Sequence, residues 1–159
     1  MRQITLILSG LLLFAPWASA QSSLPDACSL LTAAEIKAAV GIDVGTMAIN
    51  PKMNPAAGVL CDFEFPDAGA GGIAVRQLRP GETPEKVMAE LGQQKIKTGD
   101  APGIGVPSFF AYPGYGMVQL NSFKGTTHLM LQLMVFAKPQ DAVQAAAGKL
   151  MRSALARVK

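Results

Sequence analysis

Few side chains in this sequence of 159 residues could act as a nucleophile, a base or a soft metal ligand. The chain has one histidine, His128, two cysteines, Cys28 and Cys61, and eight methionines. A general base needs a partner within reach, and no catalytic motif of known spacing accompanies His128. The sequence has no G-x-S-x-G, no H-E-x-x-H and no phosphate-binding glycine loop. We therefore predict a protein that is not an enzyme, with no cofactor and no resident metal ion.

The two cysteines favour a structural role. Two cysteines in an exported chain indicate one disulfide. The alternative is a redox or metal-binding pair, but it lacks a C-x-x-C spacing and has only one histidine to support it. We predict that Cys28 and Cys61 are joined and close a loop of roughly thirty residues.

Export itself is predicted from the start of the chain. Arg2 precedes a short apolar run, Ile4–Phe14, and Ala18-Ser19-Ala20 forms a small-residue cleavage signal. The run is shorter than the about 20 apolar residues of a membrane span, so an uncleaved anchor is the weaker alternative. Gln21 stands where a lipid-anchored protein has a cysteine. We expect a signal peptide over residues 1–20, a periplasmic or secreted location, and no stable membrane anchor after cleavage.

The net charge argues against nucleic-acid binding. The chain has 14 basic and 11 acidic residues, and cleavage of the signal peptide removes one of the basic ones. A nucleic-acid partner would require a larger, clustered positive charge. We interpret the basic residues near the C-terminus as solvent-exposed side chains that suit the end of a helix. They are Lys149, Arg152, Arg157 and Lys159.

A β-hairpin is predicted for the segments Tyr115–Phe123 and Thr126–Phe136, with Lys124-Gly125 as its turn. Their alternation places leucines and valines on one face and polar and methionine side chains on the other. The expected opposite pairs on the second face are Asn121 with His128, Gln119 with Met130, and Met117 with Gln132. This face therefore gathers Met117, Gln119, Asn121, His128, Met130, Gln132 and Met134.

Three interpretations of this face stay open. The methionines could fill an irregular core under a helix or loop, because methionine packs adaptably. They could instead form a binding surface for an apolar ligand or a protein partner. A copper(I) site made of His128 and thioethers is chemically feasible, although no Met-x-x-Met run supports it.

A second candidate surface is the aromatic segment Asp100–Gly116. It concentrates Phe109, Phe110, Tyr112 and Tyr115 among glycines and prolines. Aromatic side chains on a loop can stack on a sugar or on a partner surface, and we include Phe110, Tyr112 and Tyr115 as candidate binding residues. The alternative is that the phenylalanines fill the core and the tyrosines cap a sheet edge.

Local signals predict three helices. Thr32 and Glu35 form a capping box and Gly41 is a natural C-cap, which predicts a helix over Ala33–Val40. Thr83-Pro84 begins a second helix. Pro139 opens the last helix, whose apolar stripe predicts that it covers a sheet face. The stripe consists of Val143, Ala147, Leu150, Met151, Ala154 and Val158.

Between the helices we predict short strands. They cover Val59–Phe65, Gly72–Leu78, Val106–Tyr112 and the hairpin, with a weaker candidate at Ile42–Ile49, whereas Thr98–Gly105 is expected to be irregular. The prediction is a single α+β domain, residues 21–159, with helices packed against a mainly antiparallel sheet of about five or six strands. The order is α-βββ-α-βββ-α, which hints at a pseudo-repeat.

Three stretches resemble a family of small exported domains. They are CSLLTAAEIKAAVG (Cys28–Gly41), CDFEF (Cys61–Phe65) and GIGVPSFF (Gly103–Phe110). Such domains of unknown function occur in actinobacterial cell-envelope lipoproteins, and related ones form extracellular sensor regions of some Ser/Thr kinases. The resemblance implies an α+β domain with joined cysteines, a ligand-sensing or envelope-binding role and no catalytic site. This chain departs from the family in lacking the lipid-anchoring cysteine and in having Val106-Pro107 where an acidic residue and alanine are more usual.

We therefore expect an exported, non-catalytic binding or sensing module for a small apolar ligand or a cell-envelope component. The alternative is a periplasmic inhibitor or immunity-type protein that binds an envelope-targeting hydrolase.

Overall fold

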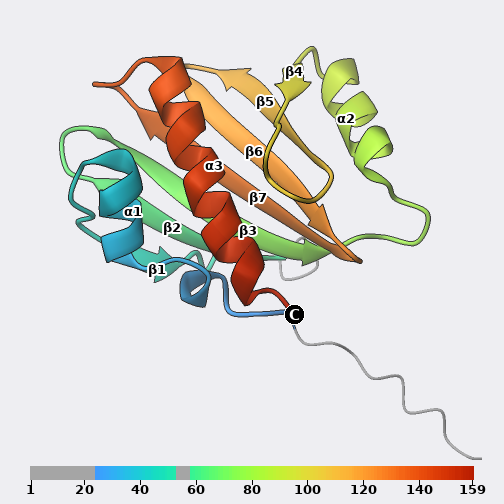
Figure 1. The fold of residues 1–159 in the computed structure, drawn as a ribbon, viewed down its shortest axis with the longest axis horizontal. Helices are drawn as coiled ribbons and strands as arrows, with labels where there is room; N and C mark the ends of the chain where they lie inside the picture. The colour runs from blue at the N-terminus through green and yellow to red at the C-terminus, as the bar shows by residue number, and fades with distance from the viewer. Residues whose placement is uncertain (1–23, 53–57) are drawn as a thin grey trace, which may run out of the picture.

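The computed structural model describes residues 24–52 and 58–159. These residues form one antiparallel sheet of seven strands, with three α-helices packed against it (Figure 1). No helix within these ranges is long and apolar enough to cross a membrane. The expected signal peptide, residues 1–20, and residues 53–57 lie outside the described residues.

Along the chain the elements are η1 (Ala27–Ser29), α1 (Ala33–Val40), β1 (Met47–Ile49), β2 (Val59–Phe65), β3 (Gly69–Gln77), α2 (Pro84–Gln93), β4 (Lys97–Asp100), β5 (Ser108–Gly114), β6 (Met117–Lys124), β7 (Thr127–Val135) and α3 (Gln140–Arg157). The α+β class and the antiparallel pairing are confirmed, but the sheet has one strand more than expected. The additional strand is β4, in a segment predicted to be irregular. It pairs only with β5 at the sheet edge and has no apolar alternation, so backbone hydrogen bonds alone define it.

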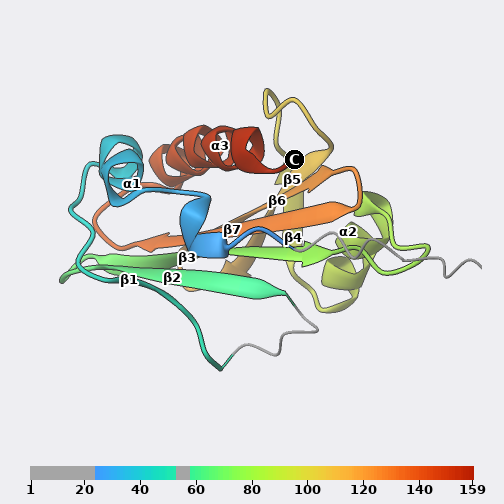
Figure 2. The same cartoon turned by 90° about the horizontal axis from the view of Figure 1, so that it is seen from below.

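The strands are ordered β1-β2-β3-β7-β6-β5-β4. The central pair, β3 and β7, joins the part of the sheet before α2 to the part after it. α1 and α3 lie on one face of this sheet, and α2 lies on the opposite face near β4 and β5 (Figure 2). If the two halves were a simple duplication, a two-fold axis perpendicular to the sheet would relate the antiparallel strands β3 and β7. Such an axis would place α1 and α2 on the same face. The predicted pseudo-repeat is therefore not a simple two-fold duplication.

Local hydrogen bonds explain where α1 begins and ends. The Thr32 hydroxyl accepts a hydrogen bond from the Glu35 backbone N–H (3.2 Å), and the Glu35 carboxylate accepts one from the Thr32 N–H (2.9 Å). At the other end Gly41 has φ +76°, a left-handed conformation that favours glycine. The predicted capping box and helix bounds are confirmed. The predicted start of α2 is confirmed too, with Thr83 as N-cap and Pro84 in the first turn.

The disulfide predicted from the sequence is present between Cys28 and Cys61, with a Cα–Cα distance of 5.0 Å. It joins η1, just before α1, to the middle of β2. The Cys61 side chain is fully buried and belongs to the main core, which lies between the sheet and the helices α1 and α3. The link therefore holds η1 against β2 at a position whose side chain lies in the main core.

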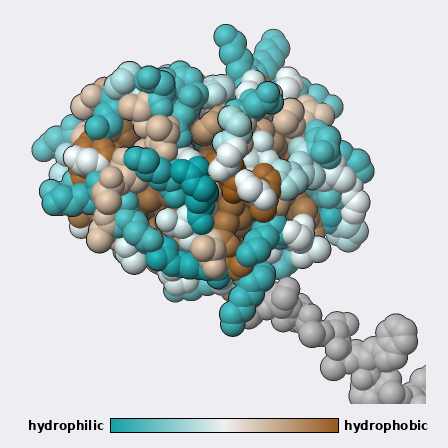
Figure 3. Space-filling model, viewed as in Figure 1, coloured by the Kyte–Doolittle hydropathy of each residue, from teal (hydrophilic) through white to brown (hydrophobic). Residues whose placement is uncertain are grey.

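The expected stripe of α3 is buried in this main core along its whole length. From the side of α3 the surface is mainly hydrophilic, and the hydrophobic colour is confined to patches between other residues (Figure 3). Among the described residues the large hydrophobic side chains that are exposed are Ile49, Tyr115 and Phe136. Tyr115 and Phe136 lie at the same end of the sheet.

An ion pair ties α1 to the end of α3. The Arg157 guanidinium donates to both carboxylate oxygens of Glu35 (2.8 and 2.9 Å) and to the backbone carbonyl of Leu30 (2.7 Å). The hydrogen bond from Arg157 is the main reason why the pKa of Glu35 falls from 4.5 to about 2, and the bonds from Thr32 add to it. The interpretation of Arg157 as a solvent-exposed charge is therefore incomplete, because its guanidinium is bonded within the fold.

We predict that this ion pair makes stability depend on acid. Between pH 4.5 and 2 the unfolded chain binds a proton at Glu35 and the folded chain does not, so stability is lost as pH falls through this range. Glu35→Gln should lower the urea midpoint at pH 7 and reduce its further fall between pH 4.5 and 2. Glu64→Gln, at an exposed position on β2, is the control. Equal acid dependence in wild type and Glu35→Gln would contradict the prediction.

Candidate functional site

The hairpin of β6 and β7 has a different register from the predicted one. Lys124 pairs with Thr127, so the turn is Gly125-Thr126 instead of Lys124-Gly125. Gly125 has φ +58° at the first central position, where a type II′ turn places glycine. The correct opposite pairs are Phe123 with His128, Asn121 with Met130, Gln119 with Gln132, and Met117 with Met134.

The grouping of side chains survives this correction, because the partner of each residue shifts by two positions and a shift by two keeps every side chain on its face. All eight residues of these pairs lie on the face opposite α3, and Phe123 among them packs against α2. The other seven carry the polar and methionine side chains of this face. We call them the methionine face: Met117, Gln119, Asn121, His128, Met130, Gln132 and Met134.

The methionine face is only partly covered. Its three central polar residues, Gln119, Asn121 and His128, are buried, whereas the remaining four are half-buried. In the described ranges α2 is the only helix on this side, and it contacts β4 and β5 (Figure 2). Its apolar side chains form a separate small cluster with the sheet, the α2 cluster. The cluster's buried members are Val87, Phe109, Ala111 and Phe123.

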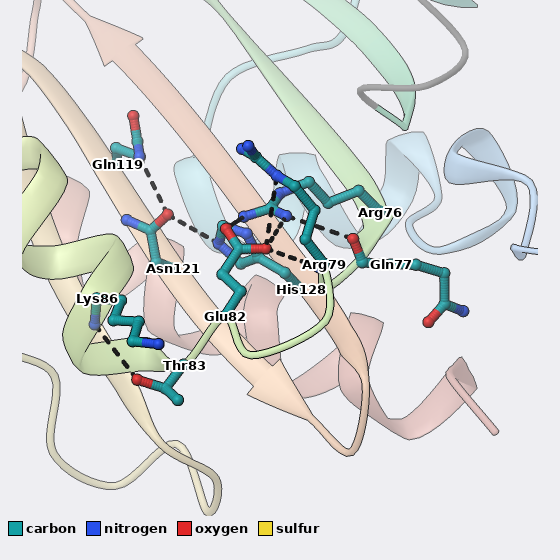
Figure 4. Close-up of polar contacts among 9 residues, drawn as sticks. All are labelled: Arg76, Gln77, Arg79, Glu82, Thr83, Lys86, Gln119, Asn121 and His128. Carbon is teal, nitrogen blue, oxygen red and sulfur yellow. Dashed lines mark hydrogen bonds and ion pairs between the residues drawn. The ribbon is translucent and has the colours of Figure 1, made fainter.

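A chain of hydrogen bonds joins the polar side chains. The Gln132 amide donates to Gln119 Oε1 (3.1 Å), and the Gln119 amide donates to Asn121 Oδ1 (3.1 Å). His128 Nε2 also lies 3.0 Å from Asn121 Oδ1 (Figure 4). Because an amide oxygen only accepts, Nε2 carries the proton of the neutral ring and Nδ1 is left as an acceptor.

Two atoms of this network are unpartnered. Among the described residues, no group bonds to Asn121 Nδ2 or His128 Nδ1, although the two side chains are 1% and 5% exposed. Buried polar atoms are normally bonded, and an unsatisfied one costs about 1–3 kcal/mol. Figure 4 shows the Asn121 amide nitrogen directed away from His128 and Gln119. The network therefore has unused hydrogen-bonding capacity in the interior of this face.

An ion pair lies beside the histidine. Arg76 pairs with His128 across β3 and β7, and its guanidinium donates to both oxygens of Glu82 (2.7 and 2.8 Å). The Arg79 backbone N–H donates to the same carboxylate (2.9 Å; Figure 4). These bonds, chiefly those from Arg76, lower the pKa of Glu82 to about 2. Glu82 is thereby held over the sheet by groups from β3 and from its own loop.

His128 is neutral at physiological pH in this environment. Burial is the largest cause that lowers its pKa from 6.5 to about 4, and the positive charge of Arg76 lowers it further, while Glu82 partly opposes them. The ring also stacks on Phe123, with centroids 4.4 Å apart and an interplanar angle of 8°. Such a histidine serves as a hydrogen-bonding and packing group. Because burial lowers its pKa, the pKa depends on the residues that cover the ring.

A metal site finds little support here. In the described parts of the chain, no group of three or more His, Cys, Asp or Glu side chains could hold a metal ion. Met117 and Met134 lie opposite each other, but Met130 lies four residues from Met134, about 13 Å along the strand. Its sulfur is already close to the Gln132 amide (3.8 Å). The register thus separates the thioethers that a copper(I) site would need to bring together.

The aromatic segment does not form one surface. Phe109 packs in the α2 cluster, whereas Phe110 packs on the opposite face in the main core. The Tyr112 hydroxyl accepts a hydrogen bond from Gln144 on α3 (2.6 Å). Tyr115 alone is fully in solvent, at 95% exposure. Alternation along β5 sends the neighbouring rings of Phe109 and Phe110 to opposite faces, where both are buried, as the alternative interpretation of this segment expected.

Pro113 and Gly114 belong to β5, and Tyr115-Gly116 forms the turn to β6. Tyr115 has φ +54° and Gly116 has φ +74°, as in a type I′ turn. The first position of this turn favours asparagine, because most side chains with a Cβ are strained in the left-handed region, whereas the short amide of asparagine can hydrogen-bond to the local backbone.

We predict that Tyr115→Asn raises the free energy of unfolding by about 1 kcal/mol, because asparagine adopts the left-handed conformation more readily. Urea unfolding of wild type and variant at one pH measures the change. Tyr115→Ala is the matched control, since alanine removes the ring but keeps the backbone strain. Equal stabilisation by alanine and asparagine would show that the backbone conformation is not the cause.

Three residues around His128 were not singled out in the sequence: Arg76, Glu82 and Phe123. Arg76 and Phe123 become its neighbours only through the register of β3, β7 and β6. Glu82 reaches Arg76 because the loop after β3 turns back over the sheet (Figure 4). The only local signal was the alternation that put Phe123 on the same face as Asn121.

An open cavity of about 960 Å³ lies elsewhere, beside the β6–β7 turn and the end of α3. Cationic side chains line it, but Lys124 donates to the carbonyls of Leu155 and Val158 and Arg157 is bound to Glu35. These cations are therefore largely committed to contacts within the fold, in contrast to the unpartnered atoms of the methionine face.

Comparisons of this chain with protein families, with curated proteins and with solved structures find no match. The resemblance to exported envelope domains therefore remains an expectation from three short stretches.

Proposed function

We propose that this protein is an exported, non-catalytic binding or sensing module whose ligand lies on the methionine face. The ligand is a small apolar molecule or an apolar part of a cell-envelope component. The observation that carries the proposal is that one sheet face combines half-buried methionines with a buried polar network. Two atoms of this network have no hydrogen-bond partner among the described residues. Main-core residues, by contrast, are covered by α1 and α3 on the other side.

The chemistry of the face suits such a ligand. Methionine side chains are flexible and polarisable, so Met117, Met130 and Met134 can adapt to an apolar body. Ligand sites are typically apolar with a few polar groups that fix orientation, and Gln132 and Gln119 offer amides next to the methionines. The Cys28–Cys61 disulfide agrees with an oxidising, non-cytoplasmic compartment. The resemblance to extracellular sensor domains supports the same proposal.

A fluorescence titration of the exported, processed protein tests it. N-phenyl-1-naphthylamine, an apolar probe that brightens when desolvated, is expected to bind saturably. Met130→Lys combined with Met134→Lys should weaken binding at least tenfold, because two buried charges would oppose an apolar ligand. Ala38→Lys, on the exposed side of α1, is the matched control. Absence of saturable binding, or an equal loss in the control, would reject the methionine face as the site.

A second function, binding of an envelope-targeting hydrolase as an inhibitor or immunity-type protein, is supported by one observation. Tyr115 and Phe136 are 95% and 70% exposed. The pairing of Met117 with Met134 brings the turn before β6 and the segment after β7 to the same end of the sheet. Exposed aromatic residues are frequent anchors of protein interfaces. Inhibition of a purified peptidoglycan hydrolase that is lost in Tyr115→Ala and Phe136→Ala, but not in the paired lysine variant above, would favour this function.

A further inference from the structure

We infer that the segment Arg79–Lys95, which contains α2, is an acid-opened lid over Asn121 and His128, and that it regulates access to the inner part of the methionine face. The inference rests on the proposed function only for the consequence, ligand access. The opening itself is a property of the free protein.

The lid segment is attached weakly compared with the other helices. No described residue of Arg79–Lys95 belongs to the main core, and α2 packs through the separate α2 cluster onto β4 and β5. Just before the lid, the Leu78 N–H donates to the Thr126 carbonyl (2.8 Å) and fixes the end of β3. The lid can therefore separate from the sheet while the main core stays intact, as expected for local opening.

Glu82 acts as the latch of the closed lid. Its carboxylate accepts three hydrogen bonds, two from the Arg76 guanidinium of the sheet and one from the Arg79 N–H of the lid. Only 8% of its side chain is exposed. Left-handed residues flank α2, Gly81 at φ +75° and Lys95 at φ +61°, and are suited to change conformation at the two ends of a moving helix.

The closed lid leaves polar atoms unsatisfied beneath it. Asn121 Nδ2 and His128 Nδ1 have no partner among the described residues, whereas water would reach both after opening. Phe123, which stacks on His128, belongs to the α2 cluster and so connects the histidine to the lid. Hydration of these atoms favours the open state, and the latch and the cluster favour the closed one.

Acid shifts this balance towards the open state. In the closed state burial and Arg76 hold the pKa of His128 at about 4, and in the open, hydrated state it returns towards 6.5. The open state therefore binds a proton at a pH where the closed state does not, so closure is favoured above pH 6.5 and weakens as pH falls towards 4.

The charges around His128 act in opposite directions: Arg76 disfavours its protonation in the closed state, whereas Glu82 partly offsets that effect. Arg76 faces it from β3, and Glu82, with Arg79 beside it, faces it from the lid. From β6 it meets the neutral Asn121 and Phe123. Lys86 of α2 donates to the Gly81 carbonyl in the lid itself. A protonated His128 would stand next to the positive Arg76 and compete with it for Glu82, which weakens the latch.

Native-state hydrogen exchange of the whole exported protein, without ligand, tests the inference. After correction for the intrinsic pH dependence of exchange, the opening constant of α2 amides should rise roughly thirtyfold between pH 7.5 and 5, from the two pKa values of His128. Amides of β6, β7 and α3 should not follow. His128→Gln, which keeps a donor for Asn121 but cannot titrate, should abolish the rise. Glu82→Gln should increase opening already at pH 7.5 and keep the rise.

Either of two results overturns the lid: α2 amides that exchange together with α3 at every pH, or an unchanged pH dependence in His128→Gln. If that variant does not fold, the wild-type pH series decides alone, because opening of α2 that is independent of pH contradicts the inference. The probe titration is a separate measurement. A lid that opens in a protein that binds no probe would leave the inference standing and reject the proposed function.

Discussion

Removal of the Cys28–Cys61 disulfide is expected to lower the free energy of unfolding by about 3–4 kcal/mol. The bond spans 33 positions of the sequence, and breaking it frees a loop of that size in the unfolded chain. In the folded chain it holds η1 against β2, where Cys61 packs in the main core opposite Ile49 and Ile73. Small domains have about 5–15 kcal/mol in total, so this one bond is a large part of the stability.

Two forms of the protein separate the causes of that loss. Urea unfolding of the reduced wild type reports the loss of the cross-link alone, and Cys28→Ala with Cys61→Ala adds the loss of the buried Cys61 sulfur and the half-buried Cys28 sulfur. Both are compared with the oxidised wild type. A reduced protein as stable as the oxidised one would contradict the prediction, and would mean that the packing around η1 is sufficient without the bond.

The second large effect is expected for Leu131→Ala, at about 3 kcal/mol. Leu131 is fully buried on β7, between Leu120 of β6 and Ile73 of β3, in the main core under α3. Truncation to alanine removes apolar contacts and leaves a cavity that a closely packed sheet-helix layer fills poorly. Few single changes in this molecule should cost more.

The neighbouring residue provides the matched control. Met130 precedes Leu131 on the same strand, but its side chain lies half-buried on the methionine face. Met130→Ala should cost only about 1 kcal/mol, since less apolar surface leaves a packed environment. Met130→Ala should nevertheless weaken binding of the apolar probe. Leu131→Ala should leave this binding unchanged when it is measured at a temperature at which the variant is folded. Equal losses of stability would show that the two faces of β7 are not differently covered.

Prediction from sequence succeeded where the decisive contacts are local. The bounds of α1 follow from Thr32, Glu35 and Gly41, residues that act within one or two turns of the same helix. The start of α2 at Thr83-Pro84 is equally local. The disulfide is a long-range contact, but it was predictable because the chain contains only two cysteines.

The hairpin shows where local information becomes ambiguous. Gly125 can occupy either central position of a two-residue turn, as the second residue of Lys124-Gly125 or the first of Gly125-Thr126. The alternatives differ by two in the partner of each residue, so both place Met117 and Met134 on the same face. The composition of the methionine face was therefore predictable, and the identity of each cross-strand neighbour was not.

By itself the sequence determined the three helices, most of the strands, the α+β class, the cysteine pair and the set of side chains on the methionine face. Caps, turns and alternation carry that information, because they act over a few residues. Only the tertiary structure decided that β4 joins the edge, that α2 lies opposite α3, and that Glu82 binds Arg76 over His128. Those features depend on the order of strands in the sheet, which brings together residues whose own neighbours along the chain give no sign of the contact.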